Sequence, residues 1–294
     1  MFVLLGGKGY VGSAFQQHLE QQELPFVVAS RASVDYSNRD TLIDFLKSQH
    51  ATFVINAAGF TGRPNVDACE LQKTECLAGN GVLPGIIRDA CEHLDLPWGH
   101  VSSGCIFTGS RTDGTGFTED DAPNFSFRQN NCSFYSGCKA LGEEVLQGAE
   151  KCFIWRLRIP FDGMDSPRNY ITKMMRYDRL LDATNSLSQL HEFVAACVAC
   201  QTLGVDYGTY NLTNPGAVTT RQVVDMISRH GLSDKQFSCF ESEEEFMAIA
   251  AKTPRSNCVL NTDKAVAAGL GMSPVEEALE AAMTNWVPMH AAAG

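Results

Sequence analysis

The sequence has neither a long apolar run nor a surplus of positive charge, and each absence excludes a class of protein. No stretch approaches the ~20 consecutive apolar residues that a helix needs to span a bilayer. The 34 acidic residues outnumber the 23 basic ones, so the 294-residue chain carries a net charge of −11. Nucleic acids and anionic membranes attract basic surfaces, and neither is therefore expected as a partner. A small anionic ligand is compatible with this charge, because a basic pocket can lie inside an acidic shell.

An export signal and a disulfide framework are also missing. Residues 1–5 lead directly into glycines without a basic start, an extended apolar core or a cleavage site, so we expect a cytoplasmic protein. The 11 cysteines are odd in number and scattered, unlike those of a secreted protein held by disulfides. Cys197 and Cys200 form a Cys-x-x-Cys pair, but no second pair or flanking histidine accompanies them. We interpret both as buried helix residues and predict no metal site.

Short apolar runs alternate with helical patterns through the first half of the chain. Strands are predicted over residues 2–5, 25–29, 52–56 and 96–101, and helices over 13–20, 39–49 and 80–93. This alternation, without an internal repeat, predicts an α/β fold with a doubly wound parallel (Rossmann) sheet. We expect residues 1–160 to form the Rossmann domain and 161–294 to form mainly a smaller C-terminal substrate-binding lobe. Part of 180–212 is expected to return to the Rossmann domain.

A glycine-rich turn follows the first predicted strand. Three glycines at intervals of three residues stand between that strand and the helical pattern that begins at Ser13. A dinucleotide fingerprint requires this context, because glycines let the backbone approach a pyrophosphate bound at the helix N-terminus. We predict cofactor contacts from Gly6, Gly9, Tyr10, Val11 and Gly12.

The second and third predicted strands end in residues that suit the rest of a dinucleotide. Arg31 follows the second strand, where an NAD-selective protein usually carries an acid, and a guanidinium there suits the 2′-phosphate of NADPH. Asp35 comes shortly afterwards, and roles beside the adenine or in a turn or helix cap both stay open. Small residues after the third strand let the backbone pass beside a cofactor. We predict NADPH as the cofactor, with further contacts from Arg31, Asn56, Ala57 and Ala58.

Three residues form a predicted reacting group. Tyr135 and Lys139 are four residues apart on a predicted helix and therefore share one face. An adjacent ammonium favours the phenolate form of a tyrosine, and such a lysine can also hold the nicotinamide ribose, so both residues are assigned to cofactor and catalysis. Ser103 follows a strand end, where parallel sheets bind ligands. We predict that Ser103 hydrogen-bonds a substrate carbonyl while Tyr135 delivers a proton to its oxygen.

Longer motifs resemble a known group of enzymes. The glycine turn, the Asn-Ala-Ala-Gly stretch at 56–59 and the Tyr-x-x-x-Lys pair are similar to the extended short-chain dehydrogenase/reductase superfamily, in its nucleotide-sugar branch. More narrowly, the chain resembles the bifunctional UDP-4-keto-6-deoxy-glucose 3,5-epimerase/4-reductases, which make UDP-L-rhamnose, in residues 103–107, 116–125, 133–136, 167–173, 211–216 and 253–257. The resemblance implies an NADPH-dependent enzyme acting on a nucleotide-linked 4-keto-6-deoxy-hexose. It is also compatible with a helix-mediated homodimer, and it leaves the oligomeric state open.

The resemblance also implies a second activity on the same ketone. A C4 carbonyl acidifies the protons at C3 and C5, so a base can remove each proton and an acid can return it from the opposite face. Cys105 and Lys173 match the acid–base pair of this family, and which of them is the acid stays open. A thiol beside cationic groups is expected to have a lowered pKa. Arg255 is predicted to bind the diphosphate, because a guanidinium matches phosphate oxygens. The predicted substrate contacts are Ser103, Gly104, Asn169, Lys173, Asn185 and Arg255.

Two other functions are compatible with the same motifs. One is a 4-reductase without epimerase activity, similar to dTDP-4-dehydrorhamnose reductase, and the pairing of Cys105 with Lys173 argues against it. The other is a non-catalytic dinucleotide-binding subunit, which the presence of Ser103, Tyr135 and Lys139 disfavours. The nucleotide itself stays open, because uridine and thymidine differ little in the groups that a loop contacts.

Overall fold

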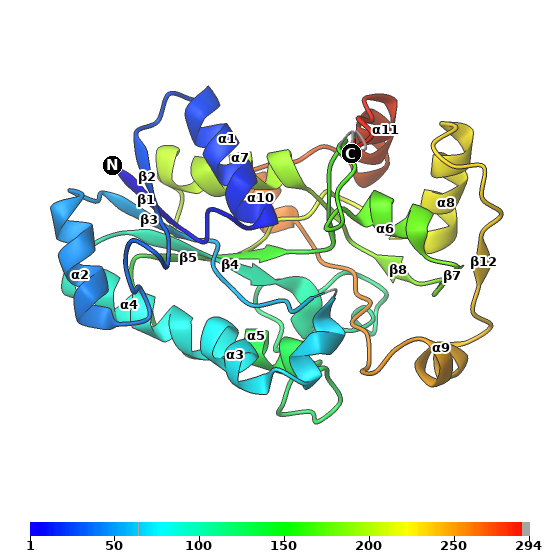
Figure 1. The fold of residues 1–294 in the computed structure, drawn as a ribbon, viewed down its shortest axis with the longest axis horizontal. Helices are drawn as coiled ribbons and strands as arrows, with labels where there is room; N and C mark the ends of the chain where they lie inside the picture. The colour runs from blue at the N-terminus through cyan, green and yellow to red at the C-terminus, as the bar shows by residue number, and fades with distance from the viewer. Residues whose placement is uncertain (64, 290–294) are drawn as a thin grey trace.

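The computed structural model describes residues 1–63 and 65–289, and its centre is a six-stranded parallel sheet (Figure 1). The strand order is β2-β1-β3-β4-β5-β10, with β1 (Phe2–Leu5), β2 (Phe26–Ala29), β3 (Phe53–Asn56), β4 (Trp98–Ser103), β5 (Cys152–Leu157) and β10 (Gly208–Asn211). Each neighbouring pair is parallel. The sheet confirms the predicted doubly wound fold. Its strand order reverses beside β1, which is where such sheets bind ligands.

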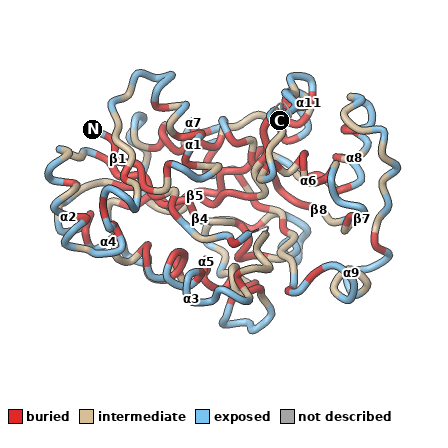
Figure 2. Tube along the Cα trace, viewed as in Figure 1, coloured by how far each residue is buried: buried red, intermediate tan, exposed pale blue. Residues whose placement is uncertain are grey.

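Helices cover both faces of this sheet. On one face α1 (Tyr10–Gln21) and α7 (Leu190–Thr202) bury a core that includes Phe15 and Trp155. On the other face α2 (Arg39–Ser48) and α4 (Leu83–His93) bury a second core against the strands. Figure 2 shows the buried sheet between two layers whose outer surfaces are exposed. Strands covered on both sides are largely apolar, which explains why β1 is a continuous apolar run and why β3 and β5 are apolar up to Asn56 and Arg156.

The second lobe has its own apolar core and lies beyond the carboxyl end of the sheet (Figure 1). Its main helices are α6 (Tyr170–Arg176), α8 (Thr220–Arg229) and α11 (Val275–Thr284), with the short α9 (Glu243–Ile249) at its edge. Two-residue strands complete it in pairs: β6 (Pro160–Phe161) with β9 (Ser188–Gln189), β7 (Arg179–Leu180) with β12 (Ser238–Cys239), and β8 (Thr184–Asn185) with β11 (Val218–Thr219).

The chain crosses back from this lobe to the sheet twice. Helix α7 packs on α1 and strand β10 extends the sheet beyond β5. The second crossing is α10 (Asp263–Ala267), where Ala265 joins the core beneath β10. The sequence pattern does not predict this second crossing, because five helical residues are too few to show a helical period. Cys197 and Cys200 are buried in α7, as predicted.

The helix predicted from Asn80 begins earlier than expected. Helix α3 (Lys73–Leu77) runs through a π-helical turn, Ala78–Val82, into α4. Glycines at 79 and 81 weaken the helical pattern in the sequence, but close packing favours small residues here. A side chain at Gly142 of α5 (Phe134–Glu144) would lie 2.3 Å from the Asn80 carbonyl oxygen. Helix α9 is a further element that the sequence pattern does not predict. Among the described residues, no helix combines the length and apolarity that a bilayer crossing requires.

The packing of β4 on β5 gives a stability prediction. A Cβ at Gly99 would stand 1.9 Å from the ring of the fully buried Trp155. We therefore expect Gly99→Ala to lower the free energy of unfolding by about 1–3 kcal/mol, as overpacked cores do. Gly85→Ala in α4 is the control, since its nearest contact would be an ordinary 3.8 Å and alanine favours the helix. Denaturant unfolding measures both, and equal stability of the two variants would contradict the packing argument.

Candidate active site

A cavity of about 660 Å³ lies between the carboxyl end of the sheet and the second lobe. This size suits a small-molecule site. The Rossmann side contributes the turn before α1, the segment after β3 and the ends of β4 and β5, while the lobe contributes α6 and the segment at 254–257. The predicted residues that line it are Gly9, Tyr10, Val11, Ala57, Ala58, Ser103, Cys105, Tyr135, Lys139, Lys173, Asn185 and Arg255.

The turn between β1 and α1 has the close approach that a dinucleotide fingerprint needs. Gly6 has a φ of +79°, and a Cβ there would meet the Ala58 nitrogen at 2.5 Å. A Cβ at Gly12 would lie 2.2 Å from the Gly6 carbonyl oxygen. Gly9 is the N-cap of α1, and no side chain among the described residues caps this helix. The glycine cradle and the open helix N-terminus therefore fit a bound pyrophosphate.

Asn56 and His100 hold the segment that passes this cradle. Both side chains are buried, and Asn56 Nδ2 lies 2.9 Å from His100 Nδ1. Asn56 Oδ1 accepts a hydrogen bond from the Ala58 backbone nitrogen at 3.1 Å. Asn56 thus shapes the loop instead of lining the cavity. Burial lowers the pKa of His100 well below its usual value, so its ring is neutral.

The reacting group is assembled by β4 and α5. Ser103 is the last residue of β4, and Ser133 caps α5 by accepting from the Ser136 nitrogen at 3.1 Å, which sets Tyr135 in the first turn. Lys139 follows one turn later and donates from Nζ to the Val101 carbonyl at 3.1 Å. The structure therefore brings all three predicted side chains to one wall of the cavity.

Burial reverses the predicted ionisation of Tyr135. We expected the Lys139 ammonium to favour the phenolate, but burial raises the pKa of Tyr135 well above its usual value, and the neighbouring Cys105 thiol adds to the rise. The Ser103 hydroxyl acts in the opposite direction and is outweighed. Burial also lowers the pKa of Lys139. Tyr135 is therefore protonated in the resting protein, which is the form that a proton donor needs.

The expected low pKa of Cys105 is also wrong for the resting protein. Burial is the largest influence and raises the pKa of the thiol, although Arg158, Lys139 and the Ser103 hydroxyl each act to lower it. Lys173 faces the same cavity from α6, and burial, followed by the charge of Arg168, lowers its pKa. Both predicted acid–base residues are thus shifted toward their neutral forms.

Some predicted residues do not reach the cavity. Asn169 is fully buried, where Oδ1 caps α6 and Nδ2 donates to backbone oxygens of Asp162 and Met164, so it positions the helix that carries Lys173. A Cβ at Gly104 would meet the side chain of Leu260 at 2.7 Å. Both residues are therefore covered by protein instead of facing a ligand. Gly6, Gly12, Arg31 and Asn56 likewise lie outside the lining.

The neighbourhood of Arg31 differs from the prediction as well. Arg31 is exposed after β2, with its guanidinium 5.8 Å from the centre of the Tyr36 ring. Asp35 Oδ1 accepts from the nitrogen and the hydroxyl of Ser37, which is the turn role left open above. Arg31 does not line the cavity, so it could contact the 2′-phosphate of NADPH only outside it.

The charge of the cavity is the feature that sequence reasoning missed most. Six cationic side chains line it, while none of its described lining residues is Asp or Glu. The six are Lys139, Arg158, Arg168, Lys173, Arg179 and Arg255. Arg158 and Arg179 belong to no recognisable local motif, and only the fold brings them together. A cationic cavity in a protein of charge −11 focuses the field on an anionic ligand.

Two of these arginines cross the cavity to the loop after β3. Arg255 makes a bidentate ion pair with Asp67, at 2.6 and 2.7 Å. Arg168 donates to the Thr61 hydroxyl at 3.1 Å and to the Gly62 carbonyl at 3.0 Å. Arg255 thus has the exposure and geometry expected of a residue that binds phosphate. In this structure, however, both terminal nitrogens of its guanidinium donate to the Asp67 carboxylate.

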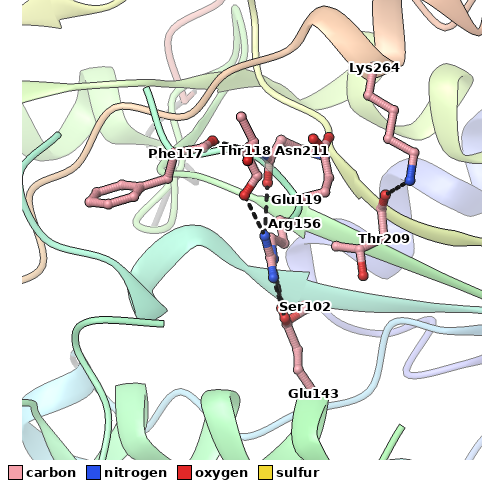
Figure 3. A network of polar contacts seen from close by, with 9 residues as sticks. All are labelled: Ser102, Phe117, Thr118, Glu119, Glu143, Arg156, Thr209, Asn211 and Lys264. Carbon is pink, nitrogen blue, oxygen red and sulfur yellow. Dashed lines mark hydrogen bonds and ion pairs between the residues drawn. The ribbon is translucent and has the colours of Figure 1, made fainter. Parts of the chain in front are cut away.

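A buried polar network centred on Arg156 links α5 to the sheet (Figure 3). Arg156 of β5 donates to Glu143 of α5, with NH2 2.8 Å from Oε2, and the two side chains are only 4% and 9% exposed. Ser102 of β4 donates to the same carboxylate at 2.5 Å. On its other side Arg156 reaches Asn211 of β10 at 3.5 Å. The network joins α5 to three strands of the sheet.

Comparison with known protein sequences identifies the family of this chain. A family model described as the RmlD substrate binding domain matches residues 1–287. The chain belongs to this family. A bifunctional dTDP-4-dehydrorhamnose 3,5-epimerase/reductase of Arabidopsis thaliana is 33% identical over 268 residues, which cover 90% of this chain and 85% of the relative. A trifunctional UDP-glucose 4,6-dehydratase/3,5-epimerase/reductase from the same plant is 34% identical over 261 residues, and the match spans only 38% of its length.

Solved structures show the same fold over the whole chain. The UDP-rhamnose synthase of Acanthamoeba polyphaga mimivirus superposes with a TM-score of 0.88 at 26% identity, covering 97% of this chain and 98% of that one. The dTDP-4-dehydrorhamnose reductase of Bacillus anthracis, solved with NADP, gives a TM-score of 0.80 at 19% identity, covering 95% of this chain and 97% of that one. The second structure confirms the fold, while the family match, the plant relatives and the mimivirus structure confirm the resemblance drawn from the sequence motifs.

The buried ion pair gives a second stability prediction. Glu143→Gln would leave Arg156 as an unpaired buried charge, and we expect the free energy of unfolding to fall by about 3–5 kcal/mol. The neighbouring Glu144→Gln is the control, because Glu144 pairs with Arg128, whose side chain is 75% exposed. Its loss should cost less than about 1 kcal/mol. Chemical denaturation of both variants tests this, and similar losses would show that burial of the pair is unimportant.

Proposed function

We propose that this protein is an NADPH-dependent 3,5-epimerase/4-reductase that converts a nucleotide-linked 4-keto-6-deoxy-glucose to the L-rhamnose nucleotide. One observation carries the proposal: Ser103, Tyr135 and Lys139 share a single cationic cavity with Cys105 and Lys173. Residues 1–160 would hold mainly the cofactor and residues 161–294 mainly the substrate, with α7 and β10 returned to the Rossmann side. The Arabidopsis relatives, whose names include both activities, support this reading.

The reduction step uses the first three residues. When bound along the glycine cradle, NADPH supplies the hydride. Ser103 donates a hydrogen bond to the C4 carbonyl oxygen, and Tyr135, which burial keeps protonated, delivers a proton to that oxygen. Lys139, held by the Val101 carbonyl one turn from Tyr135, offers a positive charge to the phenolate that results.

The epimerisation steps use Cys105 and Lys173. One of them removes a proton from C3 or C5, the electrons of that C–H bond are delocalised onto the C4 oxygen, and the other returns a proton on the opposite face. A lowered pKa favours the amine form of Lys173 and a raised pKa favours the thiol form of Cys105. We therefore assign Lys173 as the base and Cys105 as the acid in the first proton transfer.

The substrate is proposed to be a nucleoside diphosphate sugar. Its diphosphate would lie near Arg255 and Arg168, the two arginines that reach across the cavity. Guanidinium groups bind phosphate oxygens in a bidentate manner, and Asp67 occupies the equivalent position on Arg255 here. UDP is favoured by the names of the trifunctional relatives and of the mimivirus enzyme. A direct comparison of UDP and dTDP binding decides whether the nucleotide of the substrate carries uracil or thymine.

A 4-reductase without epimerase activity is the second candidate. Burial of Cys105 favours it, because a buried thiol with a raised pKa transfers protons less readily than a thiolate. In that case a separate enzyme would supply the epimerised sugar, while Ser103, Tyr135 and Lys139 would act as described.

Solvent exchange separates the two candidates. We expect purified protein in D₂O, with the 4-keto-6-deoxy-glucose nucleotide and no NADPH, to place deuterium at C3 and C5. Cys105→Ala and Lys173→Met should each reduce the exchange at least 100-fold, because one partner of every proton transfer is missing. Mass spectrometry and proton NMR of the sugar measure the label. Absence of exchange in the wild type, with intact reduction of an epimerised substrate, would leave the reductase alone.

A phenylalanine substitution tests the proton donor. Tyr135→Phe should lower kcat for reduction by about 100-fold or more, since it removes a general acid, while NADPH binding is kept. Tyr210→Phe is the control, because its hydroxyl donates to the carbonyl of the exposed Asp206 and Tyr210 does not line the cavity. NADPH oxidation followed by absorbance measures both. Undiminished oxidation by Tyr135→Phe would remove the assigned acid and would revive the non-catalytic alternative.

A further inference from the structure

Arg158 is a buried cation without a carboxylate partner. It is 5% exposed and lines the cavity. NH2 donates to Asn185 Oδ1 at 2.5 Å and to the Ser256 carbonyl, whereas Nε has no acceptor among the described residues. No ion pair in the described chain includes it, since all thirteen pairs found there involve other cations. Burying an uncompensated charge is costly and calls for an explanation.

Arg156, which lies two residues before Arg158, differs from it in having a carboxylate partner. Both arginines come from the end of β5, two residues apart, and both are almost fully buried. Arg156 is neutralised by Glu143, whereas Arg158 has only the neutral oxygens of Asn185 and Ser256. A structural role for Arg158 would be served by the same kind of carboxylate partner. The fold instead leaves this positive charge uncompensated beside the cavity.

The backbone around Arg158 is strained. Ile159 has a φ of +38°, a conformation that β-branched residues rarely adopt, and it stands between Arg158 and Pro160. Hydrogen bonds from the Arg158 nitrogen to the Ser188 hydroxyl, at 3.0 Å, and from the Ser188 nitrogen to the Arg158 carbonyl, at 2.7 Å, fix the bend. Strain of this kind persists where function requires a fixed geometry. The bend determines where the Arg158 side chain lies.

The side chain runs past Gly104 to the neighbourhood of Cys105. A Cβ at Gly104 would come within 3.3 Å of Arg158 Cδ, so glycine makes room for the arginine. The groups that influence the Cys105 thiol are the hydroxyls of Ser103 and Ser136, the Tyr135 phenol, the thiol of Cys132, and the charges of Arg158 and Lys139. The buried Cys258 packs in the same cluster. Of these, only Arg158 and Lys139 are cations, and both charges favour the thiolate, with Arg158 the stronger of the two.

We propose that Arg158 is a positioning residue for proton transfer at Cys105, and that its guanidinium is the counter-ion of the Cys105 thiolate. The inference rests on the epimerase part of the proposed function. When the Cys105 thiol gives its proton to the sugar carbon, the S–H electron pair stays on sulfur as a thiolate. The Arg158 charge stabilises that anion, and the next proton taken up by sulfur restores the thiol. The same holds if Cys105 is the base, because the thiolate is then the starting form.

The experiment follows the pH dependence of Cys105 alkylation. Iodoacetamide reacts with thiolates, and mass spectrometry of the Cys105 peptide separates this residue from the other cysteines. We expect Arg158→Gln to raise the midpoint of the alkylation profile by about one pH unit, as loss of a nearby opposite charge does. Arg158→Lys should restore part of the shift. Arg128→Gln, which removes an exposed arginine, should leave the profile unchanged.

A second variant tests the charge without removing the arginine. Asn185→Asp would place a carboxylate where Asn185 Oδ1 now accepts from Arg158, so it should neutralise the guanidinium and raise the midpoint in the same direction. This variant decides the matter if Arg158→Gln fails to fold, which the unfolding transition and NADPH binding would show. An unshifted midpoint in the folded variants would overturn the proposal.

Deuterium exchange and reduction complete the test. Arg158→Gln should slow exchange at C3 and C5 by about tenfold or more, in line with the shift in the midpoint, and by a larger factor than it slows reduction of the epimerised substrate. Equal losses in both activities would indicate a merely structural role. If the wild type shows no exchange, the epimerase function fails, but the alkylation profile still decides whether Arg158 is the counter-ion of Cys105.

Discussion

The ion pair between Glu143 and Arg156 is the constraint on which the active site depends. Tyr135, Lys139 and Glu143 recur every four residues along α5, so one helix face carries the reacting residues and the buried anchor. Because Glu143 is bound by Arg156 of β5 and Ser102 of β4, the rotation and height of the helix are fixed relative to the strand that ends in Ser103. A small slip of the helix would separate Tyr135 from Ser103 without changing any residue that touches a ligand.

The second lobe is joined to this frame by a few polar contacts around the cavity. Tyr10 of the cofactor turn donates to Asp162 at 2.9 Å, and Asn169 binds the same carboxylate while it caps α6. The helix that carries Lys173 is therefore positioned by a residue at the cofactor end of the cavity. Arg255 and Asp67 join the two sides again at the opposite wall. Such contacts place residues from distant parts of the chain around one cavity.

The sequence was sufficient for the features that depend on local pattern. The apolar run of β1, the glycines that follow it and the spacing of Tyr135 and Lys139 are encoded within a few residues, and the structure places them as predicted. The roles of Asn169 and Gly104 could not be predicted, because capping of α6 and contact with Leu260 arise only from the fold. The predicted pKa shifts of Cys105 and Tyr135 were wrong for a related reason. Burial is a property of tertiary packing, and at both residues it outweighs the effect of a neighbouring positive charge.

Burial is the largest influence on each of four titrating groups in the cavity, and at Cys105 and Lys139 nearby charges act against it. Water exclusion shifts Tyr135 and Cys105 toward their protonated forms and Lys139 and Lys173 toward their amines, so the resting site holds its protons on the oxygen and sulfur atoms. Each proton that leaves creates an anion in a medium that solvates it poorly. In the proposed reduction, Lys139, one turn away on α5, stabilises the Tyr135 phenolate. The thiolate also requires a cation, and a guanidinium keeps its charge when buried because its pKa is too high for burial to neutralise it. Arg158 therefore supplies a fixed positive charge beside Cys105 in a site where burial lowers the pKa of both lysines.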